Sequence, residues 1–358
     1  MRAVRIARLW TAIAVLLSST LLTAQWLNYP TPGLPRTSDG KPNLSAPTPR
    51  SADGKPDLSG LWAIMYRPYH TNIATDLKPE DIQPWAATLS AQRKENLGKD
   101  DPSSLRCLPF GPRVNFATDA NPLKIVQTPT LLVILSEDLT YRQIFLDGRV
   151  LPADPNPAFM GYSVGHWEGD TLVVVTAGYN DRTWLDADGH PHTESLRTTE
   201  RFYRKDFGHL ELSETFDDPK AYARPWTVKV TGELRPDTDL LEYVCNENEK
   251  DSAHMVGRAS DLKSMEVAPE VLARYVGVYS GTDRLGRPIR FEIFPSGREL
   301  SFSRDGLAKQ TLTPVSNIKF VTPSGAQLEF VEENGAIVAL QLYGIAGEPR
   351  LPRVRNEK

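Results

Sequence analysis

A polar loop between two strand-like segments holds the residues best suited to chemistry. His190 and His192 are two residues apart, and Asp181, Arg182 and Asp186 precede them. On an extended backbone, side chains at positions i and i+2 point to the same side. Two imidazoles beside carboxylates can act as acid and base, or can bind a divalent transition metal. This loop is therefore the first candidate site.

Three interpretations of the histidines remain open. In an enzyme, His190 or His192 would be the general base, Asp181 would orient it, and Arg182 would bind an anionic group of the substrate. In a metal site, the spacing does not fix a third and fourth ligand, so no cofactor is favoured and the metal stays unknown. In a structural turn at Asp188-Gly189, the histidines would only satisfy nearby polar groups.

A second candidate comes from strand register. The segment Asp206-Phe207-Gly208 is typical of a three-residue hairpin loop with glycine in the left-handed conformation. Closing this loop between Lys205 and His209 places Glu200 directly opposite Glu214. The face that they share is otherwise apolar, so two carboxylates would be buried together. Their mutual repulsion would raise one pKa, which suits general acid–base catalysis.

Two alternatives weaken this pairing. An arginine such as Arg182 or Arg224 would bridge the two glutamates and make them a structural ion pair. A slip of one residue in register would turn Glu214 to solvent and separate the carboxylates.

Aromatic and amide side chains form a third group, which suits contact with a small sugar-like, aromatic or terpenoid-like ligand. The alternative is that they fill the core and rim of a barrel. The candidate ligand-binding residues are Tyr162, Trp167, Tyr179, Asn180, Trp184 and Tyr222.

The elements that position these residues are β-strands. Residues 123–245 alternate between apolar and polar residues, and short turns such as Glu168-Gly169 separate the runs. Sequential hairpins predict an all-β fold with an antiparallel, lipocalin-like barrel at residues 58–250. One helix is expected within residues 79–95. After a linker at 251–267, residues 268–358 predict a short helix and a second, smaller β-barrel-like domain.

The N-terminus resembles a secretory signal. Arg2, Arg5 and Arg8 precede an apolar run that is shorter than the roughly 20 residues that span a bilayer, and Thr23-Ala24-Gln25 suits cleavage. We expect a signal peptide at residues 1–25 rather than a membrane anchor. Residues 26–57 form a Pro-rich tether, in which the segment Pro35–Ser45 is repeated as Pro49–Ser59. The mature protein is expected to be periplasmic or extracellular, with no membrane association.

The two cysteines, Cys107 and Cys245, are expected to form a disulfide, because secreted proteins fold under oxidising conditions. The net charge of −4 gives no electrostatic argument for nucleic acid or an anionic membrane. A small-molecule ligand is the partner that we expect, and the oligomeric state stays unknown.

Four segments resemble a family of secreted, β-rich proteins of environmental bacteria whose function is uncharacterised. They are Asp53–Trp62 (DGKPDLSGLW), Gly178–Asp186 (GYNDRTWLD), Gly189–His192 (GHPH) and Tyr243–Lys250. This resemblance implies secretion but no reaction.

The C-terminal segment Val271–Tyr279 (VLARYVGVY), with the Glu333-Asn-Gly335 turn, is similar to the lipocalin-like accessory domain of secreted serine hydrolases. That resemblance implies a β domain without catalytic residues of its own.

Together these features predict a secreted small-molecule-binding barrel with a His/Asp/Arg site at its mouth. The alternative is a lyase, isomerase or hydrolase that uses His190 or His192 on a small sugar-like or aromatic substrate. Protein interaction through the Pro-rich arm has less support.

Overall fold

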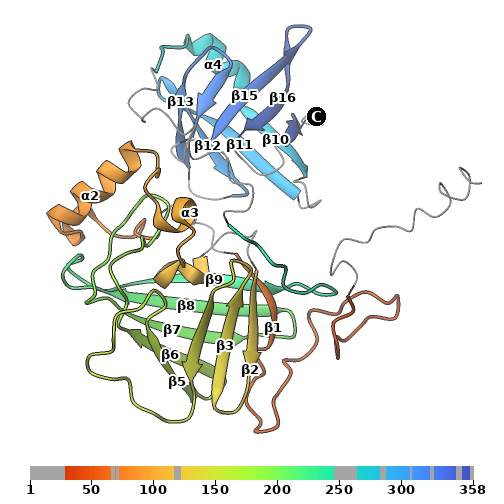
Figure 1. Cartoon of the computed structure of the whole chain (residues 1–358). Coiled ribbons are helices and arrows are strands. Elements are labelled where there is room, and N and C mark those ends of the chain that lie inside the picture. Colours follow the sequence, from red (N-terminus) through yellow and green to blue (C-terminus); the bar gives the residue numbers. More distant parts are fainter. Residues whose placement is uncertain are drawn as a thin grey trace, which may run out of the picture.

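The computed structural model describes residues 29–65, 69, 72–116, 122–245, 264–282, 288–306, 309–322, 326–343 and 349–354. The predicted signal peptide at residues 1–25 lies outside the described residues, as does most of the predicted linker at 251–267. The chain forms a closed nine-stranded barrel followed by an eight-stranded sheet (Figure 1). The predicted all-β fold is confirmed.

The barrel closes because its last strand pairs with its first, with Trp62 opposite Leu234. Buried and exposed residues alternate along β9 without interruption, as expected when one face of a sheet lines a core. The strands are β1 (Gly60–Met65), β2 (Leu123–Gln127), β3 (Leu131–Ser136), β4 (Tyr141–Phe145), β5 (Tyr162–Glu168), β6 (Thr171–Ala177), β7 (Arg197–Arg204), β8 (His209–Asp217) and β9 (Trp226–Leu234).

Two details differ from the predicted antiparallel meander. Strands β4 and β5 are parallel, with Ile144 opposite Ser163, because the segment 146–161 between them is long enough to bring the chain back along the barrel. Residues 240–245 were predicted to be a strand, but they form none. Instead Tyr243 N donates to the backbone O of Glu137, and Leu241 N donates to the Glu137 side chain, directly after β3.

The duplicated segment lies along the barrel as a strap. Its backbone bonds to the β7–β8 turn, where Gly208 N donates to Leu44 O at 2.7 Å. In both copies an arginine closes a small turn and reaches an aspartate of the barrel. Arg36 contacts Asp237 at 2.5 Å, and Arg50 contacts Asp170 at 2.6 Å. Each copy of the repeat therefore contributes one arginine that forms an ion pair with an aspartate.

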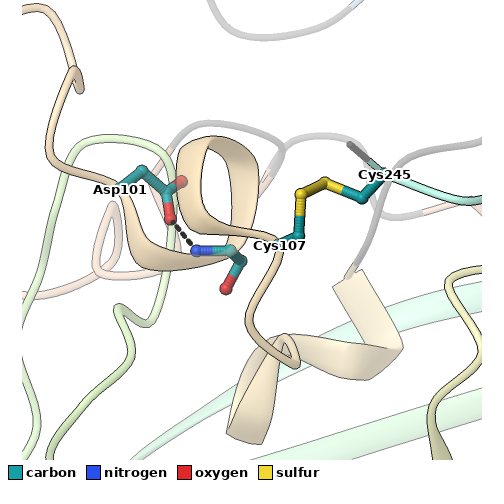
Figure 2. Close-up of a disulfide and its surroundings, with 4 residues drawn as sticks. Asp101, Cys107 and Cys245 are labelled. Carbon is teal, nitrogen blue, oxygen red and sulfur yellow. Dashed lines mark hydrogen bonds between the residues drawn. A yellow bond between two sulfur atoms is a disulfide. The ribbon is translucent and has the colours of Figure 1, made fainter. Parts of the chain in front are cut away.

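Helical segments gather at one end of the barrel (Figure 1). They are η1 (Pro79–Asp81), α2 (Pro84–Glu95), α3 (Pro102–Arg106) and η2 (Gly111–Phe116), where η marks a 3₁₀ helix. The single helix predicted within residues 79–95 is divided into η1 and α2. Asp101 caps α3 by accepting from Ser103 N at 3.0 Å, and α3 leads directly into Cys107, which is bonded to Cys245 (Figure 2). The disulfide thus ties the α3–η2 segment to the chain that follows β9.

The C-terminal unit begins with α4 (Pro269–Tyr275) and has its own apolar core. Its first strand approaches its last, through a bridge between Tyr279 and Arg353, so the sheet is nearly closed. The strands are β10 (Gly277–Thr282), β11 (Pro288–Ser296), β12 (Glu299–Arg304), β13 (Gln310–Pro314), β14 (Lys319–Val321), β15 (Gln327–Glu333), β16 (Ala336–Tyr343) and β17 (Arg350–Pro352). In the part of the chain described, we find no helix with the length and apolar character needed to span a membrane.

The disulfide predicts a large effect on stability. Cys107 and Cys245 are 138 residues apart, so the bond removes much conformational freedom from the unfolded chain. Replacing both cysteines by serine should lower the free energy of unfolding by about 2–5 kcal/mol in urea denaturation. Reduced wild-type protein is the control and should show the same loss. Identical midpoints for the oxidised wild type and the variant would contradict this role.

Candidate functional site

Two buried glutamates face one another inside the barrel. Glu200 on β7 pairs with Glu214 on β8, and their residues are 0% and 1% exposed. The hairpin closes through Lys205 N and His209 O at 3.0 Å. The predicted register and the predicted inward orientation of both carboxylates are therefore confirmed.

An arginine does bind this pair, but it is Arg142 and not Arg182 or Arg224. Arg142 points inward from β4, and both of its terminal nitrogens donate to Glu200, with Nη1 at 2.7 Å from Oε1. The same guanidinium donates to Ser163 Oγ at 3.0 Å and to Thr176 Oγ1 at 2.7 Å. Glu200 therefore has a full counter-charge, whereas no bond from Arg142 to Glu214 is observed among these contacts.

Asn115 connects the two carboxylates from the end of the barrel. It belongs to η2, and its Nδ2 donates to Glu200 at 2.6 Å and to Glu214 at 2.8 Å. The amide orientation follows from this contact, because only the nitrogen can donate to carboxylate oxygens. The other amide atom, Oδ1, is buried and has no hydrogen-bond partner among the residues that the structure describes. An unpaired buried acceptor is uncommon and costs free energy.

The position of η2 is fixed by two neighbours. Arg113 forms a buried ion pair with Asp101, with Nη2–Oδ2 at 2.8 Å. Gly111 has φ +64°, and a Cβ there would lie 2.6 Å from Thr183 Oγ1 in the polar loop that follows β6. Only glycine allows so close an approach, so η2 and the polar loop pack together at the same end of the barrel.

The two glutamates of the cluster differ in their protonation. Burial raises the pKa of Glu214 well above its ordinary value of 4.5, and the negative charge of Glu200 raises it further. Burial disfavours the charge of Arg142, but Glu200 outweighs this effect and raises the pKa of the guanidinium. The geometry therefore favours an ionised Arg142–Glu200 pair beside an uncharged Glu214, which can both donate and accept hydrogen bonds.

Tyr179 extends the cluster toward the histidines. Its hydroxyl lies 2.9 Å from Thr198 Oγ1 on β7, and burial raises the pKa of the phenol. The ring of His192 meets the ring of Tyr179 edge-on, with centroids 6.3 Å apart. Tyr179 therefore contacts the histidine loop and also experiences the charges of Arg142 and the glutamates.

The two histidines lie in different environments. His190 Nδ1 is 2.6 Å from Asp186 Oδ2, and burial lowers the pKa of His190 less than Asp186 raises it. His192 Nε2 is 2.8 Å from Thr183 Oγ1, and burial lowers the pKa of His192 to about 4. His192 is thus neutral near pH 7, and His190 forms a His–Asp pair of the kind that orients a general base.

The role assigned to Asp181 is corrected by this geometry. Asp186 orients His190, and backbone N–H groups of Ile73 and His190 in turn hold the Asp186 carboxylate. Asp181 and Arg182 are exposed on the surface, with Arg182 over the ring of Phe159. Within the described ranges, no group of three or more His, Cys, Asp and Glu side chains is arranged to hold a metal ion.

The predicted aromatic residues divide between core and surface. Tyr222 is buried and donates to Pro191 O at 2.8 Å, and Trp184 lies beneath the guanidinium of Arg93. Trp167 packs against the core from the other end of β5. Tyr162 faces outward against Phe145. The remaining amide, Asn180, accepts from Arg182 N at 3.2 Å. Of the six, only Tyr179 reaches the glutamate cluster.

Sequence reasoning missed several members of the cluster. Arg142 lies two residues before Ile144, at an inward position of an alternating strand. A charged residue at a core position is a signal that could have identified it. The hydroxyls of Ser163, Thr176 and Thr198 also occupy inward positions. Asn115 carries no such signal, because a 3₁₀ segment without periodicity places it.

Comparison of the chain with protein-family models and with curated proteins finds no match. Function is therefore inferred from the chemistry of the site.

The unequal charges predict different effects of matched substitutions. Glu200→Gln leaves the buried Arg142 charge without a partner and should cost about 3–5 kcal/mol of stability. Glu214→Gln exchanges one neutral group for another and should cost less than about 1 kcal/mol. In the wild type, the unfolded chain loses the Glu214 proton above pH 4.5 while the folded protein keeps it. Wild-type stability must therefore fall relative to Glu214→Gln as pH rises from this value.

Urea denaturation of both variants at pH values of about 4.5 and 8 tests this asymmetry. Equal losses in the two variants would contradict the assignment of charge.

The two histidines should titrate separately. NMR of the imidazole protons should give a midpoint near 4 for His192 and one above 6.5 for His190. Asp186→Asn is the control variant, since it should lower the His190 midpoint and leave that of His192 unchanged. A His192 midpoint above that of His190 would disprove the environments described.

Proposed function

We propose that this protein is a secreted small-molecule-binding barrel whose ligand contacts the interior polar cluster. The observation that supports this proposal most is the Asn115 carbonyl, which is buried beside an uncharged Glu214 and has no partner in the described part of the chain. A ligand hydroxyl could donate to Asn115 Oδ1 and also exchange a hydrogen bond with Glu214. The disulfide is consistent with the proposed secretion.

The charge balance of the cluster indicates the kind of ligand. Arg142 already neutralises Glu200, so an added ionic group would have no counter-charge and would be costly to bury. A neutral ligand with hydroxyl groups, such as a sugar or a phenol, meets both requirements. Such ligands are held by a few polar contacts in an otherwise apolar environment, and Glu214 lies on β8 between the buried, inward-facing Leu212 and Phe216.

The entry side follows from where the cluster residues originate. Asn115 comes from η2 and Tyr179 from the loop after β6, and the two segments meet at Gly111 and Thr183. A ligand would approach from this end, beside the segment that the disulfide anchors. This position agrees with the polar loop that sequence analysis places at the barrel mouth.

A second candidate function is acid–base catalysis, by a lyase, isomerase or hydrolase. The observation that favours it is the His190–Asp186 pair at the same end of the barrel as the uncharged Glu214. In this alternative His190 accepts a proton from the substrate and Glu214 supplies one.

Thermal-shift measurements with neutral mono- and disaccharides and plant phenolics test the binding proposal, together with native mass spectrometry of the secreted protein. Binding compounds should raise the melting temperature of the wild type. Asn115→Ala and Glu214→Leu should each weaken binding by about tenfold or more, as expected for the loss of one buried hydrogen bond.

Gln143→Ala is the control for these variants, because Gln143 neighbours Arg142 but is exposed on the outer face of β4. Undiminished binding in both interior variants would contradict the proposed site. His190→Asn separates the two functions, since it should abolish turnover of a substrate but leave binding of a ligand intact.

A further inference from the structure

A concave surface lies on the outside of the barrel, over strands β6–β9. It encloses about 410 Å³, a volume within the range of about 300–1,000 Å³ that is common for ligand pockets. We call it the outer groove. The side chains that give it chemical character are Arg201, Tyr203, Glu211, Ser213, Lys229 and Thr231.

Strand register arranges these side chains in two adjacent rows. Ser213 on β8 is paired with Arg201 on one side and with Lys229 on the other. The two cations are thus two strands apart, roughly 10 Å between their backbones. In the second row, Glu211 is paired with Tyr203 and with Thr231.

The base of the outer groove is rigid, because the residues between these rows belong to the barrel core. Phe202, Leu212 and Val230 are all buried. The rows are therefore held at fixed spacing by the packing beneath them, and the outer groove does not need to reorganise before it binds a ligand.

The side chains of the outer groove combine positive charge with an aromatic ring. Three charged residues of the outer groove are exposed, namely Arg201, Glu211 and Lys229. Arg201 is held in place by Glu168 at 2.8 Å, which uses one of its several donors. Tyr203 is 41% exposed, so part of its ring is open to solvent. The hydroxyl-bearing Ser213 lies between Arg201 and Lys229, and Thr231 lies beside Glu211.

We propose that the outer groove binds an acidic saccharide, namely an oligosaccharide that contains uronic acids. The carboxylates of such a chain would pair with Arg201 and Lys229, and an apolar sugar face would pack on Tyr203. The sugar hydroxyls would bond to Glu211 and Ser213. A neutral saccharide would offer no carboxylate to Lys229 or to the remaining donors of Arg201, which already pairs with Glu168. A simple polyanion would be repelled by Glu211 and would make no use of the Tyr203 ring.

Isothermal titration of the full-length mature protein with trigalacturonic acid tests this proposal. The expected result is saturable binding that weakens as salt concentration rises, because exposed charge pairs are screened. Arg201→Ala, Lys229→Ala and Tyr203→Ala should each reduce the affinity by about tenfold, the equivalent of about 1.4 kcal/mol. Maltotriose, a neutral trisaccharide, should bind at least about tenfold more weakly.

Matched controls come from the same outer surface. Arg197 is exposed on the outer face of β7 but lies outside the outer groove, as does Tyr141 on β4, which is 63% exposed. Arg197→Ala and Tyr141→Ala should leave the affinity unchanged. Circular dichroism of each variant establishes that it is folded.

Three outcomes would overturn the proposal: no binding of trigalacturonic acid to folded wild-type protein, equal affinity for maltotriose, or equal losses in the groove and control variants. Glu214→Gln should have no effect on this titration, because Glu214 faces the barrel interior. The proposal for the outer groove can therefore be disproved while the proposal for the interior site is supported, and the reverse is also possible.

Discussion

The ion pair between Arg142 and Glu200 lies where neither charge has access to water, and the rest of the site depends on it. A buried charge is tolerated only when a partner and hydrogen bonds replace its hydration. Arg142 obtains its charge partner from Glu200 and further hydrogen bonds from Ser163 and Thr176. These three residues come from three different strands. The barrel must therefore close with β4, β5, β6 and β7 in one register for this charge to be satisfied.

Glu214 differs from Glu200 in its surroundings. Burial raises the pKa of Glu214, and the negative charge of Glu200, to which Arg142 donates, raises it further. Replacing such a cluster by apolar residues is often neutral or stabilising for a protein. A barrel that keeps an ion pair, an uncharged acid and an unpaired amide carbonyl in its core therefore suggests a use beyond stability, which is why we place the proposed ligand there.

Segments that are separated in the sequence come together at this end of the barrel. The disulfide and the Asp101–Arg113 ion pair hold η2 in place, Gly111 lets it approach the polar loop, and η2 then presents Asn115 to both glutamates. Helix α2 supports the loop from the other side, where Arg93 donates to Gly189 O at 2.9 Å. Asn115 and the histidines thus share a rigid frame although they belong to different elements.

Local patterns determined a large part of this protein. Period-two alternation and turn residues predicted nearly all strands of both sheets, because side chains of a strand alternate between its faces. The length of the loop Asp206-Phe207-Gly208 predicted the β7–β8 register, and with it the meeting of Glu200 and Glu214, although Gly208 does not adopt the expected left-handed conformation. The cysteine pair followed from their number and from the expected oxidising compartment. In each case the information lies within a short segment or in a simple count.

The tertiary structure decided which partner each functional side chain has. Arg142 rather than Arg182 or Arg224 reaches Glu200, and Asp186 rather than Asp181 orients His190. Asn115 enters the cluster from a 3₁₀ segment, and β5 joins β4 in parallel. Such contacts depend on barrel closure and on how irregular segments fold over its end, and neither leaves a periodic trace in the sequence. Hydrogen bonds between distant residues require a specific distance and orientation, which only the folded chain provides.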